Sequence, residues 1–321
     1  MKRKRLLICG ATGFIRRNLA EFFSRQEEFQ VIGVCHLKPP FEYPGLEWIQ
    51  ADLTSSTDVE RALTGIDVII QAAATTSGAK DIVTRPHIHV ADNAVMNSLL
   101  FRAAFDKKVG HVVFFSCTVM LQTSERAQTE EDFDANVPIH PRYFGAGWTK
   151  VYLEKMSEFY SRIGSTRYTV IRHSNVYGPH DKFDLERSHV FGATVTKVMT
   201  ARDGRIVIWG SGEEGRDLLY VDDLADCVDR AIRSQTSPFA IYNCGYGEAI
   251  IVKHLVEKII EKSGRSLRVE YDLSQPSIKT SVFLDCGKAK RELGWVRATS
   301  LDRGIDQTLA WWRAHIASSC S

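Results

Sequence analysis

The segment 143–150, YFGAGWTK, holds two side chains that can take part in proton transfer, and it begins an amphipathic pattern typical of a helix. Tyr143 carries a phenol and Lys150 carries an ammonium group. Residues four apart on a helix are neighbours, whereas residues seven apart are two turns, ~10.5 Å, apart along the axis. Tyr143 therefore shares a face with Lys150 but is too far away to act with it without a local rearrangement. Ala146 occupies the position four residues before Lys150.

A glycine-containing loop, GATGFIRRN, follows the first apolar run. Gly10 allows a tight turn, and Gly13 lets backbone N–H groups approach a diphosphate at the N-terminus of the next helix. Arg16 and Arg17 fall in the first turn of that helix, where two cations oppose the helix dipole unless an anion lies there. The pattern indicates a dinucleotide-binding loop, and a plain structural turn is the alternative.

Short apolar runs alternate with helical patterns through the first 178 residues. This alternation predicts an α/β fold, a Rossmann-like doubly wound parallel sheet with helices on both faces. The runs are almost continuously apolar, as expected when both faces of a sheet are covered. The predicted strands lie in RLLICG, FQVIGVCH, LEWIQADL, DVIIQAAA, HVVFFSCT and YTVIRHSNVYG.

The regular alternation of predicted strands and helices ends after Gly178, where a polar loop and more mixed elements follow. We therefore predict a dinucleotide-binding Rossmann domain over residues 1–178, with a returning segment around 216–250. Residues 179–321 mainly form a smaller substrate-binding lobe. Such a lobe lies over the carboxyl ends of the strands, where open parallel sheets bind their ligands.

Composition limits the classes of function. The chain has 321 residues, of which 44% are hydrophobic and 25% charged, and its net charge of +2 indicates neither a nucleic-acid nor a membrane partner. The apolar run after KRKR stops after about four residues, too short for a signal peptide or a membrane span. Seven cysteines without a C-x-x-C pair argue against a disulfide framework or a metal site, and they predict a reducing, cytoplasmic compartment.

The loop, placed after the first strand of this pattern, resembles that of the extended short-chain dehydrogenases/reductases. These include nucleotide-sugar epimerases, dehydratases and reductases. Their loop reads G-x-x-G-x-x-G, and Arg16 stands where the third glycine allows close packing of helix and strand. The resemblance implies a nicotinamide dinucleotide held by Gly10, Thr12, Gly13, Phe14, Ile15, Arg16, His36, Lys38, Asp52, Leu53, Ala72, Ala73 and Lys150.

The end of the second strand selects the cofactor in this family. An acidic residue there binds the ribose of NAD, and a basic one suits the 2′-phosphate of NADP. The segment GVCHLKPP has no Asp or Glu, and His36, Lys38 and Arg16 are nearby. The sequence therefore favours NADP(H) over NAD(H). Asp52 resembles an adenine-contacting residue, although an ordinary turn residue is an alternative.

Several stretches resemble the GDP-L-fucose synthase branch of the family: FFSCTVM, SNVYGPHDKFDLERSHV and VIWGSGEEGRDLLYVDDLAD. The resemblance extends to about residue 230 and implies a GDP-4-keto-6-deoxy sugar as substrate. It assigns hydrogen bonding to Ser116, positive charge beside the cofactor to Lys150 and the acid of epimerisation to His189. The implied substrate contacts are Asn175, His189, Lys197, Trp209 and Arg216.

The chain departs from that branch at catalytic positions. Ala146 replaces the tyrosine that carries the proton in hydride transfer, and Thr118 replaces the cysteine that serves as base. Met120 replaces a further tyrosine. Cys117 is adjacent, but the alternation of a strand predicts that it points to the opposite face.

We therefore expect an NADP-dependent nucleotide-sugar epimerase/reductase of low activity. The alternatives are a nucleotide-sugar 4-epimerase and a non-catalytic NAD(P)-binding protein of the same fold. A 4,6-dehydratase is less favoured, because SCT lacks the following Asp-Glu.

The resemblance also implies a homodimer built on helices within 93–107 and 147–163. Apolar residues that we expect at the surface of these helices would face the partner. They are Met96, Leu100, Tyr152 and Phe159.

Overall fold

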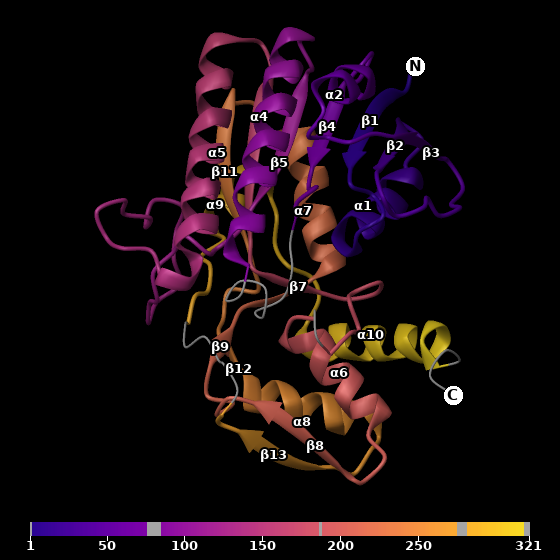
Figure 1. The fold of residues 1–321 in the computed structure, drawn as a ribbon, viewed down its shortest axis with the longest axis vertical. Helices are drawn as coiled ribbons and strands as arrows, with labels where there is room; N and C mark the ends of the chain where they lie inside the picture. The colour runs from indigo at the N-terminus through magenta and orange to yellow at the C-terminus, as the bar shows by residue number, and fades with distance from the viewer. Residues whose placement is uncertain (1, 76–84, 186–187, 275–280, 318–321) are drawn as a thin grey trace.

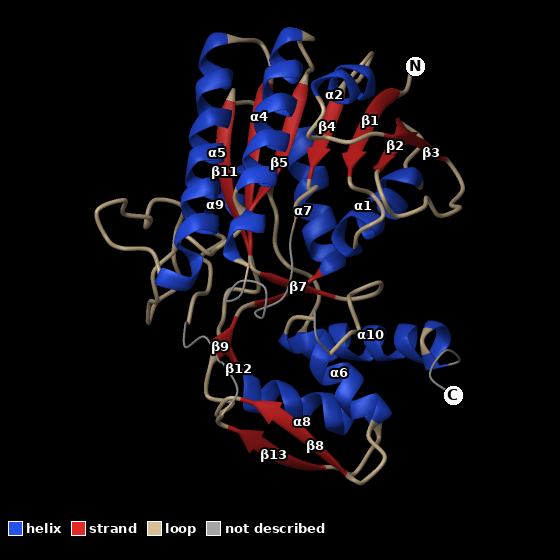
Figure 2. Ribbon diagram, in the orientation of Figure 1, coloured by secondary structure: helices blue, strands red, loops and turns tan. Residues whose placement is uncertain are grey.

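The computed structural model describes residues 2–75, 85–185, 188–274 and 281–317. A seven-stranded parallel sheet forms the larger part of these ranges, in the order β3-β2-β1-β4-β5-β6-β11 (Figures 1 and 2). The predicted doubly wound α/β fold is thereby confirmed. The strands are β1 (Lys4–Cys9), β2 (Phe29–Cys35), β3 (Leu46–Gln50), β4 (Val68–Gln71), β5 (His111–Ser116), β6 (Arg167–His173) and β11 (Phe239–Cys244).

Helices cover both faces of the large sheet, which explains why its central strands are apolar throughout. Helices α1 (Phe14–Ser24), α7 (Val221–Ser234) and α9 (Gly287–Leu293) pack on one face. Helices α2 (Ser56–Ala62), α4 (Ala91–Asp106) and α5 (Phe144–Ile163) pack on the other. The elements of the returning segment, α7 and β11, thus belong to the larger part of the structure. Helix α7 packs beside α1, and β11 is the edge strand next to β6.

The surface predicted for α4 needs correction. Met96 is only 8% exposed and Leu100 is fully buried, so both belong to the core between α4 and the sheet. Val95 is the exposed apolar residue of this helix. On α5, which packs beside α4, Tyr152 and Phe159 are both more than half exposed, as expected.

The remaining elements form a smaller lobe below the carboxyl ends of the strands (Figure 2). Its core joins α6, α8 and α10 to a two-stranded sheet of β8 and β13, with Val195, Leu255 and Leu309 fully buried. The lobe and its connections comprise β7 (Asn175–Tyr177), α6 (Val190–Thr200), β8 (Arg205–Trp209), β9 (Gly215–Arg216), β10 (Leu218–Tyr220), β12 (Ile250–Ile251), α8 (Val252–Ser263), β13 (Arg268–Asp272) and α10 (Leu301–His315). Two short 3-10 helices, η1 (Pro86–His89) and η2 (Pro141–Tyr143), precede α4 and α5.

A buried carboxylate joins the two parts where β7 and β10 pair. Asp217 has no exposed surface, and its two oxygens accept backbone N–H groups from Tyr246 at 2.6 Å, Leu284 at 3.0 Å and Gly247 at 3.3 Å. Its own carbonyl accepts the backbone N–H of Asn175 at 3.0 Å. Four chain segments far apart in sequence are therefore fixed to one another at the base of the lobe.

A second link connects α1 to the loop after β7. The Asn18 amide donates to the carbonyl of Pro179 at 2.9 Å, and His180 lies 3.3 Å from the Glu21 carboxylate. His180 has a φ of 65° and packs edge-on against Trp311 of α10. Helix α1, this loop and α10 are thus held together.

No helix in the described ranges is long and apolar enough to cross a bilayer. Within the same ranges, no group of three or more His, Cys, Asp or Glu is arranged to hold a metal ion.

Candidate functional site

The glycine-containing loop lies at the carboxyl end of β1, beside β4, where the order of the strands across the sheet reverses. Gly10 has a φ of 70°, which favours glycine, and Gly13 is the N-cap of α1. Ala73 lies close above Gly10, since a Cβ on Gly10 would come within 3.1 Å of the Ala73 Cβ. The space over the loop is therefore a narrow slot between the ends of β1 and β4, the usual place for a dinucleotide in such sheets.

Arg16 fills much of this slot. Its guanidinium donates to the carbonyl of Ala72 at 3.0 Å, and a Cβ on Gly13 would lie only 2.6 Å from its Cζ and Nε. Burial lowers the pKa of Arg16 to about 10, so the side chain is charged at neutral pH.

The residues expected at the adenosine end form a more open surface. His36 and Lys38 are exposed beyond β2, and the His36 Nε2 lies 3.8 Å from the Asp52 carboxylate. Asp52 also accepts hydrogen bonds from the backbone and hydroxyl of Thr54, which lower its pKa. Leu53 is buried and packs in the core below. These residues fit an adenosine ribose and its phosphate, so a dinucleotide is compatible with this end of the site.

The other loop residues shape the slot. Phe14 and Ile15 are partly buried against the core on the α1 face of the sheet, whereas the side chain of Thr12 is half-buried at the turn. No acidic residue lies in the first turn of α1. The positive end of the helix dipole is therefore directed at the slot without a nearby side-chain anion in that turn.

Ser116, at the end of β5, is buried and hydrogen-bonded to a side chain of α5. Its hydroxyl donates to the Glu154 carboxylate at 2.5 Å, and Arg172 holds the same carboxylate through contacts of 3.0 and 2.7 Å. This ion pair is almost fully buried. The hydroxyl proton of Ser116 is therefore engaged in the bond to Glu154, so the oxygen can only accept a hydrogen bond from a ligand.

Lys150 lies one turn before Glu154 on α5, and its ammonium group donates to the carbonyl of Phe115 at 2.7 Å. Burial lowers its pKa, partly opposed by nearby Cys117 and Glu154. Ala146 is half-buried one turn earlier, in the first turn of the helix. The structure thus places the Lys in register with β5, with only a methyl group on the residue one turn before it.

Cys117 follows directly after β5. Because β5 ends at Ser116, strand alternation does not extend to residue 117, and Cys117 lies within electrostatic range of both Lys150 and Tyr143. Burial raises the pKa of its thiol, against the effect of Lys150.

Two imidazoles enter the same region, one from the lobe and one from the large sheet. His189, the N-cap of α6, has its pKa lowered by burial and by the charges of Lys182 and Arg216. His173, at the end of β6, donates its Nδ1–H to the carbonyl of Ser174 at 2.7 Å. Burial lowers its pKa to about 4, with smaller effects of Lys150 and His189. Both rings are thus disposed to be neutral at pH 7, a form that can take up a proton.

Tyr143 is turned into this region rather than out to solvent. It ends η2, packs beside Trp148 and Leu284, and lies within electrostatic range of Arg216 and Cys117. Burial raises its pKa, and burial lowers that of Arg216. A phenol and a guanidinium from opposite sides of the lobe junction therefore lie within electrostatic range of each other.

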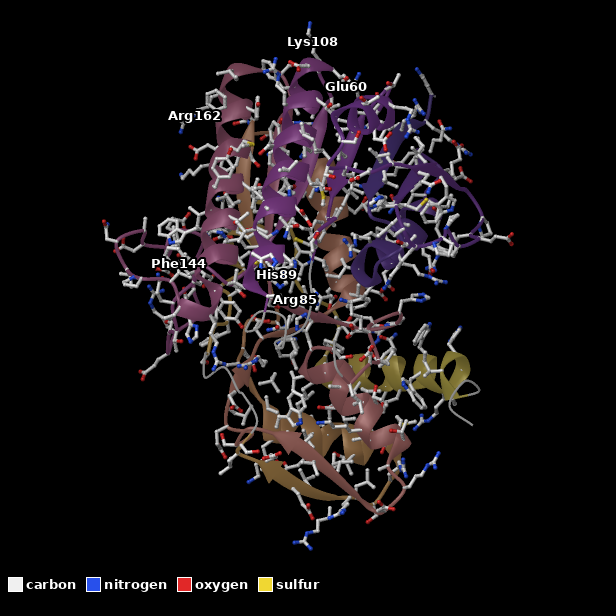
Figure 3. The ribbon with its side chains drawn as sticks, viewed as in Figure 1. Glu60, Arg85, His89, Lys108, Phe144 and Arg162 are labelled. Carbon is white, nitrogen blue, oxygen red and sulfur yellow. The ribbon has the colours of Figure 1, made fainter. Side chains whose placement is uncertain are left out.

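The other predicted substrate residues are less closely grouped. The Asn175 amide donates to the Asp217 carbonyl at 3.2 Å. In the lobe, the Lys197 ammonium lies 5.4 Å from the centre of the Trp209 ring, which is about half exposed, and donates to Val207 at 2.7 Å. Figure 3 shows Arg85 and His89 between the start of α4 and the lobe.

Sequence reasoning missed His173 and Glu154. A histidine at the carboxyl end of a parallel strand, and a carboxylate four residues after Lys150, were signals that could have identified them. Asp181 is largely buried near the start of α6. One of its oxygens accepts the Lys182 backbone N–H at 2.7 Å, and the other has no hydrogen-bond partner within the described chain.

Comparisons with known proteins agree with this geometry. The family described as the NAD dependent epimerase/dehydratase family matches residues 6–245. The chain is 25% identical over 316 residues to the GDP-L-fucose synthase of Azorhizobium caulinodans, covering 97% of each protein. It is 27% identical over 258 residues to that of Escherichia coli, covering 77% of this chain and 80% of the relative.

Among solved structures, UDP-glucose 4-epimerase of Thermotoga maritima superposes with a TM-score of 0.86 at 23% identity, covering 97% of this chain and 99% of that one. This likeness concerns the fold. The chain belongs to the NAD dependent epimerase/dehydratase family. The curated relatives it resembles include GDP-L-fucose synthases, as the sequence motifs predict.

Asp181 should make stability depend on pH. Burial raises its pKa to about 7, against ~3.9 for an unperturbed Asp. Between these values the unfolded chain binds fewer protons than the folded one, so this group contributes less stability as pH rises. We expect Asp181→Asn to be more stable than the parent by about 1 kcal/mol or more at pH 8, because one pKa unit corresponds to ~1.4 kcal/mol.

Urea unfolding of the parent and Asp181→Asn at pH 4.5 and pH 8 measures this difference. The gain should be several-fold smaller at the lower pH, which lies only slightly above the unfolded pKa. Asp203→Asn, at an exposed position of the lobe, is the matched control and should shift neither value. An equal effect of Asp181→Asn at both pH values would contradict the assignment.

Proposed function

We propose that the chain is a nucleotide-sugar epimerase/reductase that prefers NADP(H), acts on a GDP-4-keto-6-deoxy sugar and transfers hydride slowly. The observation that carries this proposal is the group of Lys150, Cys117, His173, His189 and Arg216 at the carboxyl edge of the sheet. GDP-L-fucose synthases among its relatives support the sugar nucleotide.

Proton exchange beside a keto group needs a neutral base near the sugar. The burial that lowers the pKa of His189 keeps its imidazole neutral at pH 7, so it can take a proton from the carbon next to the keto group. Arg216 and Lys150 supply positive charge to stabilise the enolate oxygen that forms. Cys117 is the second proton-transfer group, in place of the absent cysteine at position 118.

Reduction makes a further demand on the site. A bound nicotinamide dinucleotide supplies the hydride, while the protein must protonate the sugar oxygen. Ala146 offers no proton, and Ser116 has committed its proton to Glu154. These two facts support slow reduction beside competent proton exchange.

The preference for NADP(H) rests on charge. Within Val31–Phe41 the chain has no carboxylate, and His36 and Lys38 lie exposed where a 2′-phosphate would be bound. Titration with NADPH and NADH measures this preference, and tighter binding of NADH would contradict it.

A non-catalytic NAD(P)-binding protein is the second candidate function. Two residues favour it. Arg16 in the slot hinders binding of a dinucleotide, and Ala146 on α5 offers no proton for hydride transfer. The turnover of Ala146→Tyr, which places a phenol at this position, distinguishes the two candidate functions.

Arg216→Ala should weaken the binding of a GDP-sugar more than tenfold, about 1.4 kcal/mol. The guanidinium can pair with a phosphate through two hydrogen bonds, and alanine cannot. Calorimetric titration with GDP-mannose measures the loss. Arg205→Ala removes the same charge from an exposed position of the lobe and should leave affinity unchanged. Equal affinities for the parent and Arg216→Ala would remove Arg216 from the site.

Ala146→Tyr should raise 4-keto reduction at least tenfold. Losing a general acid–base group typically lowers rates by ~10²–10⁴, and Lys150 is in register to lower the pKa of a phenol four residues before it. The assay follows oxidation of saturating NADPH with a GDP-4-keto-6-deoxy sugar, together with deuterium uptake from solvent. We expect the parent to exchange deuterium while reduction remains slow.

Ala146→Phe is the matched control, because it adds the ring without the hydroxyl and should not gain activity. A parent that already turns over at an ordinary ~1–10³ s⁻¹ would show that another group, Tyr143 first, supplies the proton. If Ala146→Tyr binds both ligands and stays inactive, the non-catalytic function is favoured.

We also propose that the chain forms a homodimer through α4 and α5. Exposed Val95, Tyr152 and Phe159 form an apolar surface on these helices, and Figure 3 shows Phe144 projecting at the lower end of α5. Light scattering at micromolar concentration should give twice the chain mass. Tyr152→Glu with Phe159→Glu should give monomers, whereas Lys155→Ala on the same helix should not. A monomeric parent would contradict the proposal.

A further inference from the structure

Arg16 lies where the glycines of the loop leave room for a ligand. Its Cζ and Nε lie 2.6 Å from the position of a Cβ on Gly13, and its Nη1 lies 3.1 Å from that of a Cβ on Gly10. The space that glycine normally provides for a phosphate is therefore filled by a side chain of the protein itself.

The contacts of Arg16 show how it is kept there. Within the described chain, its guanidinium makes one hydrogen bond, to the Ala72 carbonyl at 3.0 Å. This bond joins the loop after β1 to the end of β4 and closes the slot between them. The neighbouring Arg17 behaves differently: it pairs with Glu21 at 3.0 Å and lies 4.2 Å from the centre of the Phe41 ring.

The position of the charge is unusual for a helix start. A cation in the first turn is repelled by the positive end of the helix dipole, and an anion there would be attracted. Gly13 provides no side-chain cap, and no acidic residue follows it in the first turn. The loop therefore keeps the features that attract a phosphate, while Arg16 occupies the approach to it.

We propose that Arg16 is an internal competitor for the diphosphate of the dinucleotide, so that the cofactor binds only when this side chain leaves the slot. The inference rests on the proposed function, in which a dinucleotide binds at this loop. Displacing Arg16 breaks its bond to Ala72, which links the loop after β1 to the segment after β4. Part of the binding free energy is used for this step, and affinity falls.

Removal of the side chain should therefore tighten binding. We expect Arg16→Ala and Arg16→Gly to bind ADP-ribose, NADPH and NADH at least tenfold more tightly than the parent by calorimetry. ADP-ribose contains the diphosphate without the nicotinamide, so its gain reports on the loop alone. Arg17→Ala removes the same charge from the adjacent position and should change each dissociation constant less than twofold.

Two variants are used so that, if one of them loses stability, the other stays folded and can still be tested. Glycine in a helix is less favourable than alanine by ~1 kcal/mol, so Arg16→Ala is expected to keep the stability of α1 even if Arg16→Gly does not. Thermal unfolding of each variant checks this. Unchanged or weaker binding by a folded Arg16→Ala would overturn the proposal and would identify Arg16 as neutral or as a phosphate ligand.

A parallel titration with GDP separates this inference from the proposed function. If no variant binds a dinucleotide while all bind GDP, the competitor role is overturned and the nucleotide-sugar site stands. If Arg16→Ala gains affinity for ADP-ribose and no variant binds GDP, the competitor role is supported and the proposed substrate fails.

Discussion

The arrangement of the site depends on the buried carboxylate of Asp217. Burying a charged group is unfavourable unless hydrogen bonds replace its water, and three backbone N–H groups do so here. Burial still raises its pKa, since the hydrogen bonds offset only part of the desolvation. Because these donors come from the turn after β11 and from the segment before α9, the same interaction fixes the adjacent Arg216 against the sheet. The lobe side of the site is positioned through this one residue.

Much of the fold follows from the sequence, because apolar runs and glycine turns report backbone geometry directly. The position of Lys150 against β5 also follows, since helix spacing determines which residues share a face. The surface of α4 could not be predicted in this way. Its apolar residues surround the helix, so periodicity does not distinguish Val95, which is exposed, from Met96 and Leu100, which are buried.

Other features of the site depend on tertiary contacts that local patterns do not contain. The place of Arg16 is set by the space over Gly10 and Gly13 and by a carbonyl 56 residues away. Cys117 lies just beyond the end of β5, within electrostatic range of Lys150, and strand ends are poorly marked in sequence. His173 could have been recognised, since a polar residue at the carboxyl end of a parallel strand lies at the usual ligand edge.

The link between α1 and the loop after β7 has a consequence for how such a protein can diverge. Asn18 donates to the carbonyls of Phe14 and Pro179, and so it joins the start of α1 to the loop that leads to His189. The cofactor and substrate sites proposed for this chain thus share one mechanical support. Under that proposal, a substitution that reshapes one site displaces the wall of the other, so cofactor choice and substrate choice would not be free to change independently.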